Sequence, residues 1–387
     1  MPLSIQAALA RRLALLAGVA VGCASANAQS YLTYVDSNSD MVHLADPTTG
    51  VLDTFGWIVD DVSSTNYNFQ TPIEAIQVGN EIWVTDQLSD AIYRFTANYA
   101  APTFISGITT QLDNVRGLAL VGNRVYVSNS GTANGAPGRS IVVYETDGTL
   151  VGSLSIINPL TNLAVDPFDV SDFNGQLLIS DIEGEDLVVC NTDGTNVSVL
   201  FDGNANLAEF PQQTHITNSG PSGSQEVWVD CFSSPAGVYR LTAQGVQVAY
   251  YPVTTGGRGM WVLPRLDTGE ERFLYSDGVV PNGGILRRQI GLPTSDLIVQ
   301  GSGRFIGSVT FTSQPVCDSI DFNNDTSLFD PQDIDAFLSV YSEGPCIPDT
   351  ATCSDIDFNN DSSVFDPCDI DSFLLVFSEG PCTLCGI

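Results

Sequence analysis

The sequence has 387 residues and a formal net charge of −32, and each of its 13 lysine-or-arginine positions is arginine. Phosphate groups bind cationic side chains, so this composition argues against nucleic-acid binding and, by the same reasoning, excludes attachment to an anionic membrane surface. The length predicts two or three domains, and the charge is typical of an acidic secreted protein kept soluble in salty water, where ions screen its self-repulsion.

Residues 1–28 have the pattern of a secretory signal peptide. A pair of arginines precedes a short apolar run, and Ala26-Asn27-Ala28 forms a small-x-small cleavage site. The run is too short to span a bilayer. Cys23 allows a second interpretation, a lipidated cysteine, although Ala20-Val21-Gly22 before it matches that motif poorly. We expect a secreted protein, extracellular or associated with the cell surface, without a transmembrane segment.

Residues 29–314 predict an all-β domain. Short runs rich in Val, Ile, Tyr and Trp alternate with Gly, Asn, Asp and Pro turns, and no long helical period occurs. One phrase recurs at a spacing of about 43 to 52 residues: an apolar strand that ends in a small or hydroxyl residue and Asp, a loop, and a second strand. Its six copies begin at Leu32, Ile82, Val125, Leu177, Val227 and Phe273.

Six units of this length indicate a six-bladed β-propeller. A further strand is expected before each of the last five copies, at Glu74–Val78, Arg116–Leu120, Asn162–Asp166, Thr214–Thr217 and Gly259–Leu263. The first copy lacks such a strand, and Phe305–Phe311 after the sixth copy can supply it. The ring would then close with a blade shared by both ends of the domain, which removes exposed strand edges.

The run Asn80–Asp86, continued by Ile92–Phe95, resembles the NHL and gluconolactonase-like group of six-bladed propellers. The resemblance spans most of residues 31–311, and each copy matches the repeat only approximately. It implies the fold rather than an activity, because this architecture serves binding proteins, lactonases and lyases alike.

Side chains of the innermost strands line a propeller's channel, and aligning the copies places five of them near one mouth: Glu74, Arg116, Asn162, His215 and Arg258. In lactonase-like propellers a Glu, an Asn and an Asp there hold a divalent metal, and Glu74 matches that Glu in strand position only. Two arginines would oppose a cation and favour a carboxylate or sulfate ligand. His215 is either a general base, as in a lyase-like propeller, or a histidine hydrogen-bonded by Thr214 and Asn218.

The aspartates that end the second strands, Asp36, Asp86, Asp181 and Asp277, are expected to form turns rather than to act in catalysis. No Gly-x-Ser-x-Gly elbow, zinc motif or phosphate loop is present. The sequence therefore favours a non-catalytic binding or scaffold propeller whose ligand is unidentified and can be a carbohydrate, another small molecule or a protein. The alternative is an enzyme, a lactonase or a polysaccharide lyase or hydrolase, with Glu74, His215, Arg116 and Arg258 as candidate catalytic residues.

Residues 315–387 contain a duplication: the run that begins at Cys317 returns 36 positions later at Cys353. Asp-x-Asn-x-Asp followed by a helix predicts a calcium loop, because alternate residues of a tight loop direct oxygens to one ion. In an EF-hand an acid at loop position 12 closes the loop, but here Gln332 or Cys368 holds that position. The acid comes one residue later, at Asp333 or Asp369, so we infer a loop that is one residue longer than in an EF-hand. The eight expected ligands for two Ca²⁺ ions are Asp321, Asn323, Asp325, Asp333, Asp357, Asn359, Asp361 and Asp369.

Each loop leads into a predicted helix that has an Asp N-cap, Pro at the first helical position and a Gly-Pro stop. The helices carry matching apolar stripes, too narrow to be stable alone, at Ile334, Phe337, Leu338 and Tyr341 and at Ile370, Phe373, Leu374 and Phe377. Two units packed face to face would bury both stripes.

This tandem loop–helix arrangement resembles a dockerin, the module that docks secreted proteins onto cohesin domains. It is most similar to the cysteine-containing dockerin-like tails of planctomycete secreted proteins. The resemblance covers residues 316–387 and implies calcium-dependent folding and a cohesin-like or other extracellular anchoring partner. The alternative is an acidic, disulfide-linked tail without an ion.

Eight of the nine cysteines follow the signal peptide, and an even number in an oxidising compartment predicts disulfides. Three pairs are candidates in the tail, although the sequence does not fix the connectivity: Cys317 with Cys346, Cys353 with Cys382, and Cys368 with Cys385. Upstream, Cys190 and Cys231 either pair with each other or stay free.

Overall fold

The computed structural model describes residues 28–60, 66–206, 208–220, 223–233, 235–253, 256–277 and 283–312, and towards the C-terminus residues 319–324, 331–342, 344–346, 353, 356, 358, 369–370, 373–374 and 377. The chain divides into two compact units, one formed by residues 30–310 and one that includes the residues from 311 onward. Apart from Ala28, the predicted signal peptide lies outside the described residues. No helix within the described ranges is long and apolar enough to cross a membrane.

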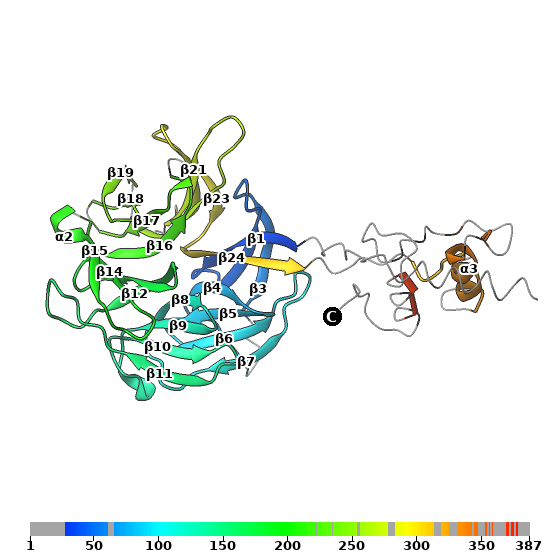
Figure 1. The fold of residues 1–387 in the computed structure, drawn as a ribbon, viewed down its shortest axis with the longest axis horizontal. Coiled ribbons are helices and arrows are strands. Elements are labelled where there is room, and N and C mark those ends of the chain that lie inside the picture. The colour runs from blue at the N-terminus through cyan, green and yellow to red at the C-terminus, as the bar shows by residue number, and fades with distance from the viewer. Residues whose placement is uncertain are drawn as a thin grey trace, which may run out of the picture. The chain divides into compact units, whose positions relative to one another are not determined.

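The larger unit is a ring of six four-stranded sheets, the blades (Figure 1). The first blade has the strand order β24-β1-β2-β3, from Gly303–Thr312, Ala28–Asp36, Met41–Ala45 and Leu52–Val59. The second consists of β4 (Pro72–Val78), β5 (Glu81–Asp86), β6 (Ala91–Thr96) and β7 (Phe104–Ile108). The third consists of β8 (Val115–Val121), β9 (Arg124–Asn129), β10 (Ser140–Glu145) and β11 (Leu150–Leu154), with the short 3-10 helix η2 (Ala133–Gly135) in a loop.

The remaining blades repeat this arrangement. The fourth consists of β12 (Pro167–Phe173), β13 (Gln176–Asp181), β14 (Asp186–Cys190) and β15 (Ser198–Asp202), followed by the short helix α2 (Gly203–Asn206). The fifth consists of β16 (Pro211–Thr217), β17 (Glu226–Cys231), β18 (Gly237–Thr242) and β19 (Gln247–Pro252). The sixth consists of β20 (Gly257–Val262), β21 (Arg272–Asp277), β22 (Gly284–Gln289) and β23 (Ser295–Gln300). The inner strands β4, β8, β12, β16 and β20 contact their neighbours around the channel.

The ring closes as predicted, with a blade made from both ends of the domain. Strand β24 pairs with β1 and becomes the innermost strand of the first blade. The closure continues into the second blade, because the Gln77 side chain accepts the Thr310 N–H at 2.6 Å and donates to the Thr310 carbonyl at 2.9 Å. The six-bladed propeller expected from the repeats is thus confirmed.

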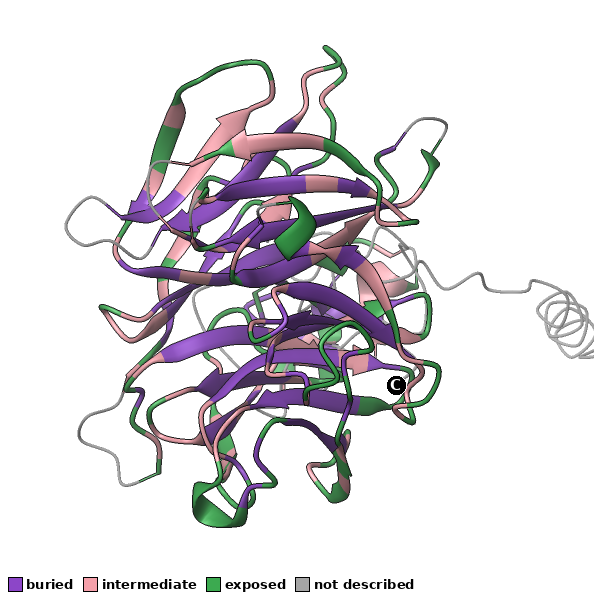
Figure 2. Cartoon of the chain, turned by 90° about the vertical axis from the view of Figure 1, so that its left-hand side faces the viewer, coloured by how far each residue is buried: buried purple, intermediate pink, exposed green. Residues whose placement is uncertain are grey.

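The cores of this unit lie between neighbouring blades, where the strands are buried (Figure 2). Trp83 of the second blade, for example, packs with Val125, Val127 and Tyr144 of the third. The outermost strands alternate between exposed and half-buried residues, as in β7 and β11. This gradient explains the sequence pattern, because the middle strands are apolar on both faces and the outer strands on one.

The prediction of one inner strand, at residues 162–166, was wrong. Residues 162–166 lie in the loop that precedes β12, where Ala164 makes an isolated bridge to Ile157, and β12 begins later, at Pro167. Asn162 has a left-handed backbone (φ 57°), and its N–H donates to the Asn158 carbonyl. The Asn158 side chain holds this turn by donating to Asp181 and Asp186, both at 2.8 Å. A left-handed Asn cannot continue an extended strand, so the strand starts after the turn.

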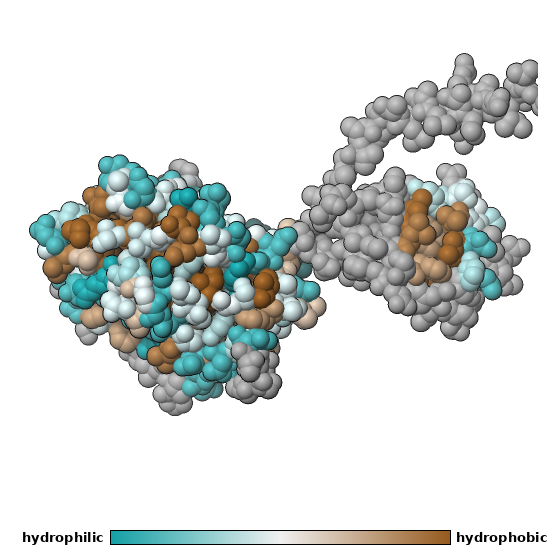
Figure 3. Space-filling model, turned by 90° about the horizontal axis from the view of Figure 1, so that it is seen from below, coloured by the Kyte–Doolittle hydropathy of each residue, from teal (hydrophilic) through white to brown (hydrophobic). Residues whose placement is uncertain are grey.

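The C-terminal unit contains α3 (Pro331–Tyr341), which begins at the predicted proline. Aromatic residues of both repeats form its core, and Phe337 stacks on Phe373 with ring centroids 4.2 Å apart. The predicted stripes are not wholly buried, because Leu338 and Leu374 are 47% and 48% exposed. Apolar side chains are accordingly visible on the surface of this unit (Figure 3).

The disulfide pairing proposed for the tail was wrong where the structure describes it. Cys346 is bonded to Cys353, so neither residue is available for the expected bonds to Cys317 and Cys382. The bond joins the end of the first repeat to the start of the second, since only seven positions separate the two cysteines and their Cα atoms lie 5.7 Å apart. Cys317, Cys368, Cys382 and Cys385 lie outside the described residues.

The two upstream cysteines are free and buried. Cys190 belongs to the apolar core that β9, β10 and β12 share with β13 and β14, whereas Cys231 lies in the next core around the ring. Their separation into two cores explains why they do not pair.

Candidate functional site

The structure separates the five side chains that the sequence placed at one mouth. Arg116 and Arg258 are each the second residue of an inner strand. Glu74 and His215 lie further along their strands and line a different cavity. Asn162 lies in the turn before β12 and in neither group.

The second residues of the six inner strands occupy equivalent places at the start of those strands, and they are Ile73, Arg116, Phe168, Gln212, Arg258 and Arg304. Sequence reasoning missed Arg304, because the predicted strand began one residue later, at Phe305. A signal was present: Gly257-Arg258 and Gly303-Arg304 share the same dipeptide at the start of β20 and β24.

A cavity of about 280 Å³ opens beside this layer, and Phe168, Phe210, Phe232, Gln212, Arg258 and Arg304 are among its lining residues. The guanidinium of Arg258 lies over the Phe232 ring, 5.2 Å from its centroid. Arg116 lies behind the wall, with its guanidinium 4.6 Å from the centroid of Phe168. Three phenyl rings and two cationic groups therefore face one small space.

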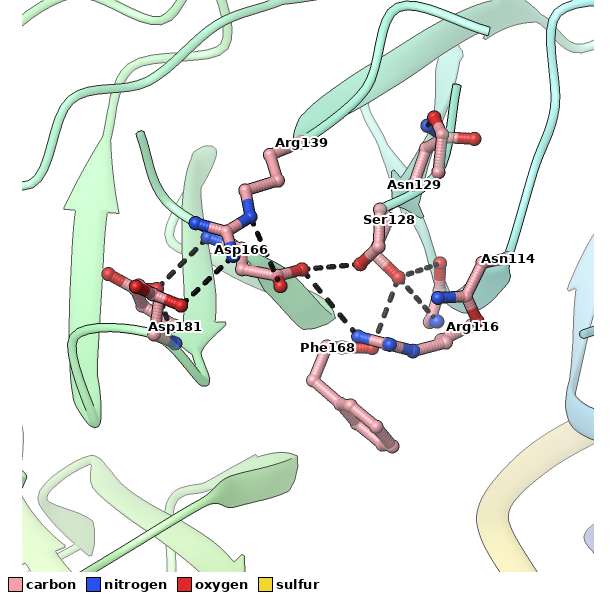
Figure 4. A network of polar contacts seen from close by, with 12 residues as sticks. Asn114, Arg116, Ser128, Asn129, Arg139, Asp166, Phe168 and Asp181 are labelled. Atoms are coloured by element: carbon pink, nitrogen blue, oxygen red, sulfur yellow. Dashed lines mark hydrogen bonds and ion pairs between the residues drawn. The ribbon is translucent and has the colours of Figure 1, made fainter. Parts of the chain in front are cut away.

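The Arg116 side chain is 9% exposed and is held by polar contacts that Figure 4 shows. Its Nη1 lies 3.7 Å from Oδ1 of Asp166, and Arg139 Nε lies 3.4 Å from the other Asp166 oxygen. Ser130 also donates to this carboxylate. Asp166 is thus shared by two arginines, and among the described residues Arg116 Nε has no hydrogen-bond partner. Burial lowers the pKa of Arg116, because it disfavours the charged guanidinium. A further anion nearby would stabilise the charged form.

Arg258 and Arg304 bring two like charges into the cavity. Burial and the neighbouring charge of Arg258 lower the pKa of Arg304 to about 9, although Asp36 opposes this effect. Arg304 Nε donates to Ser37 Oγ at 2.6 Å, whereas Arg258 Nε finds no acceptor within the described part of the chain. An anion placed between the two guanidinium groups would offset their repulsion.

The second cavity, of about 330 Å³, lies further along the inner strands. Its lining includes Glu74, His215 and Trp261, and the His215 and Trp261 rings lie 4.0 Å apart. Burial lowers the pKa of His215 to about 4, so the imidazole is neutral at pH 7. The expected bond from Thr214 is absent, because the Thr214 hydroxyl bonds to Asp169 and Ser171 instead.

Glu74 has a carboxyl neighbour that sequence reasoning missed, Asp169 on β12. Glu74 Oε2 accepts the Leu118 N–H at 2.5 Å, and Asp169 Oδ2 accepts the Thr214 N–H at 2.7 Å. Burial raises the pKa of Asp169 to about 6, and burial together with the Asp169 charge raises that of Glu74 well above its usual range. Asp169 was overlooked because the strand that carries it was predicted too early.

No group of three His, Cys, Asp or Glu side chains suited to a metal ion occurs among the described residues. The oxygens identified above already accept backbone N–H groups from neighbouring blades. Glu74 and Asp169 therefore join neighbouring blades.

Three of the four aspartates that end the second strands, Asp36, Asp86 and Asp181, accept N–H groups in the turns that follow them, as predicted, whereas residues 278–282 after Asp277 lie outside the described residues. Asp86 accepts the N–H of Ser89 in its own turn and the N–H of Thr71 at the entry to β4. Asp181 accepts the N–H groups of Glu183 and Asp166 in the same way. These side chains fix the loops that lead into the inner strands and take no part in either cavity.

Half of the expected calcium ligands lie in the described residues. Asp321, Asn323, Asp333 and Asp369 are all buried. Asp325, Asp357, Asn359 and Asp361 lie outside the described residues.

No known protein family and no curated protein matches the sequence. Solved structures do match it. A chain of the nidogen–laminin complex aligns with a TM-score of 0.52 and 15% identity, over 72% of this chain and 98% of that one. A Bacteroides fragilis protein described as a candidate 6-phosphogluconolactonase aligns with a TM-score of 0.50 and 12% identity, over 73% of this chain and 98% of that one. At these identities the likeness establishes the propeller fold alone.

Proposed function

We propose that the propeller binds a small ligand with a carboxylate or sulfate group at the mouth formed by Arg116, Arg258 and Arg304. The observation that carries this proposal is the convergence of Arg258 and Arg304 on one aromatic-walled cavity, with Arg116 behind its Phe168 wall. Guanidinium groups bind such anions through paired N–H donors, and the phenyl rings would pack against the apolar face of the ligand.

The ligand is expected to be a small molecule rather than a long polyanion. The chain carries a net charge of −32, so an extended anionic polymer would be repelled by the protein as a whole. The binding energy of a single anionic group inside the cavity depends mainly on the two nearest arginines, because the local dielectric constant is low there and distant charges are screened. A uronic acid or a monosulfated sugar has this chemistry.

Titration calorimetry of the intact protein with sodium sulfate and with D-glucuronate tests the proposal, with glucose as the neutral probe. We expect glucuronate to bind and glucose to give no heat. Arg258→Gln and Arg304→Gln are each expected to weaken glucuronate binding by about tenfold or more, because each removes charge-assisted hydrogen bonds.

Arg124→Gln is the matched control, since Arg124 makes a partly exposed ion pair with Glu145 on the third blade. It removes the same charge outside the cavity and should leave the affinity unchanged. Equal binding of glucuronate and glucose, or equal loss in Arg124→Gln and Arg258→Gln, would show that the mouth is not an anion site.

For the C-terminal unit we propose that two Ca²⁺ ions organise a docking module that anchors a secreted protein to an extracellular partner. Buried Asp321, Asn323, Asp333 and Asp369 support this, because buried carboxylates need compensating charge. Leu338 and Leu374 support a docking face, since they occupy the same place in the two repeats and are half-exposed. The Cys346–Cys353 bond supports export to an oxidising compartment.

Calcium titration of the intact chain, followed by calorimetry, tests the module. Asp333→Asn should lose one of two calcium-binding events, whereas Asp335→Asn, an exposed position on the same helix, should keep both. Docking is tested on the native cell envelope: chelation should release the wild-type protein, and the double variant Leu338→Asp, Leu374→Asp should bind calcium without attaching. Retention of both binding events in Asp333→Asn, or attachment that survives chelation, would contradict the proposal.

A second function, an enzyme that cleaves lactones or uronic-acid polymers, is favoured by one observation: Glu74 and His215 line the same cavity. The intact protein would then turn over such substrates, and His215→Ala would abolish turnover. Absence of turnover would contradict the enzyme function and would not affect the proposal of a binding function.

A further inference from the structure

The third residues of the inner strands form a layer next to the second residues that carry the arginines. They are Glu74, Gly117, Asp169, Gln213, Gly259 and Phe305. The Gln213 amide accepts the N–H groups of Met260 and Ile306, on two other inner strands, at 3.0 and 2.9 Å. Glu74 and Asp169 each accept an N–H group of the next inner strand. An inner strand has a partner strand on one side only, so these three polar side chains lie along its free edge, where the channel runs.

Glu74 has one carboxyl oxygen that no protein group uses. Its Oε2 accepts the Leu118 N–H, whereas Oε1 makes no hydrogen bond within the described residues, although it is not closed off from solvent. Glu74 is 5% exposed, and it lines the cavity of about 330 Å³ together with Leu118. The free acceptor of this buried carboxyl is therefore available from that cavity.

The carboxyls of Glu74 and Asp169 have no cationic partner. None of the ion pairs among the described residues involves either of them. Asp169 is ionised at neutral pH, because its pKa is raised only to about 6, and its charge contributes to the raised pKa of Glu74. Buried carboxylates are normally paired with cations. The two carboxyls therefore leave an uncompensated negative charge at this level of the channel.

The rest of the cavity wall suits an apolar body. The rings of Trp261 and His215 lie 4.0 Å apart, and both residues are half-buried, so part of each is accessible. The His215 imidazole is neutral and adds no positive charge. An aromatic face attracts cations, so the rings and the carboxyls favour a ligand of the same charge. Apolar side chains complete the wall: Ile76, Leu120, Val170, Ile216 and Ile306.

We propose that this cavity binds an organic cation that carries a primary ammonium group on an apolar body. The ammonium group donates to Oε1 of Glu74, and the body packs against Trp261 and the aliphatic wall. A cation at this place stabilises the ionised form of Glu74 and offsets the charge of Asp169. The cavity volume falls in the range of small-molecule sites.

This proposal does not rest on the anion site at the arginine-lined mouth. The two cavities share no lining residue, and they favour ligands of opposite charge. A cation is expected at Glu74 and an anion at Arg258, so failure of either proposal leaves the other standing. The test below measures binding, so it is also independent of any turnover in this cavity.

The test is nuclear magnetic resonance of the intact protein with ¹⁵N-labelled tryptophan, which gives one indole N–H signal for each of the four Trp residues. The probe is benzylamine, which is protonated at pH 7.5. Benzyl alcohol has nearly the same shape without the charge, and benzoate has the opposite charge. We expect benzylammonium to shift the Trp261 signal saturably, benzyl alcohol to bind at least about tenfold more weakly, and benzoate to leave this signal in place. Trp261→Phe assigns the signal.

Glu74→Gln tests the role of the carboxyl, because an amide can still accept the Leu118 N–H but cannot take a negative charge. It should weaken benzylammonium binding by about tenfold or more, while the unliganded indole spectrum persists. Glu145→Gln is the matched control, since Glu145 makes a partly exposed ion pair with Arg124 on the third blade, and it should leave the affinity unchanged.

Three outcomes would overturn the proposal. The first is the absence of a saturable Trp261 shift with benzylammonium in the wild type. The second is an equal affinity for benzylammonium and for benzyl alcohol or benzoate at this signal, a comparison that needs no variant. The third is an equal affinity of Glu74→Gln and Glu145→Gln for benzylammonium.

Discussion

A single backbone position sets the chemistry of the channel mouth. The second residue of the inner strands is apolar in the second and fourth blades, an amide in the fifth and arginine in three others. Each blade has four strands, and these residues hold the same position in their inner strands, so the repeated scaffold fixes where the side chains stand and leaves their identity free. This separation of scaffold and site is why the propeller fold alone does not reveal a ligand.

The fifth blade carries a buried carboxyl where other blades have a hydroxyl. Asp230 lies opposite Val238, as Thr85 lies opposite Ile92 and Ser180 opposite Leu187. Burial, and to a smaller extent the charge of Asp277, raises the pKa of Asp230 well above its usual range. The folded protein therefore prefers the protonated form.

Asp230→Ser is expected to make unfolding less sensitive to pH. A raised pKa in the folded state stabilises the protein below the pKa of the unfolded chain, near pH 4, and this stabilisation is lost as pH rises towards the folded value. The wild type should therefore lose stability from about pH 4 to neutral pH relative to the variant, as followed by thermal unfolding in circular dichroism. Asp267→Ser, at an exposed site, is the control, and equal pH profiles for all three proteins would contradict the assignment.

Hydroxyl side chains join the blades to one another. Thr85 Oγ1 donates to the Arg116 carbonyl at 2.5 Å, Ser128 Oγ to that of Phe168 at 3.0 Å, and Ser180 Oγ to that of Gln212 at 2.6 Å. Each donor is the next-to-last residue of the second strand of one blade, and each acceptor is the second residue of the next inner strand. The same bonds thus hold the mouth layer in place.

Ser180→Ala should lower the free energy of unfolding by about 1 to 3 kcal/mol, because it leaves the buried Gln212 carbonyl without this donor. Denaturant unfolding of the intact chain measures the effect. Ser153→Ala, at an exposed position on β11, makes the same chemical change without a buried partner and should cost less than about 0.5 kcal/mol. Indistinguishable midpoints for the two variants would show that the hydroxyls do not join the blades.

The disulfide of the tail can be mapped chemically, because the segment between the two cysteines contains Asp349. Cleavage before Asp, without reduction, should release peptide 335–348 linked to peptide 349–354 through Cys346 and Cys353, identified by its mass. The pairing expected from sequence would instead link peptide 335–348 to peptide 296–317. That second product would contradict the observed bond.

Strands with strong apolar runs could be predicted from sequence, and those set by loops could not. The copies around Trp83 and Leu178 have unbroken Val, Ile and Leu patterns, so their strands and the ring closure followed from repetition. The start of β12 depended on a left-handed Asn162 and on Asn158 bonds to distant aspartates, which no local pattern signals. Cysteine pairing likewise depended on how the repeats meet, so sequence spacing misled.

At the scale of the whole molecule, charge is the dominant property. The described ring pairs most of its arginines with acids, as Arg94 with Glu81 and Arg240 with Glu226, so few cations remain to offset the excess negative charge. The sequence from residue 316 onward contains no basic residue at all. Like charges at this density repel one another in the compact state and less so in the unfolded chain.

Salt is therefore expected to stabilise the protein. Raising sodium chloride from about 0.02 M to about 0.5 M shortens the Debye length from roughly 20 Å to roughly 4 Å, so repulsion between distant acids is screened while buried pairs are little affected. We expect the unfolding temperature of the ring to rise by at least about 2 °C, near 1 kcal/mol for a domain of this size. Potassium chloride should act equally, because screening does not depend on the cation. A fall in unfolding temperature, or a rise with calcium only, would place the stabilisation in specific ion sites instead of in the overall charge.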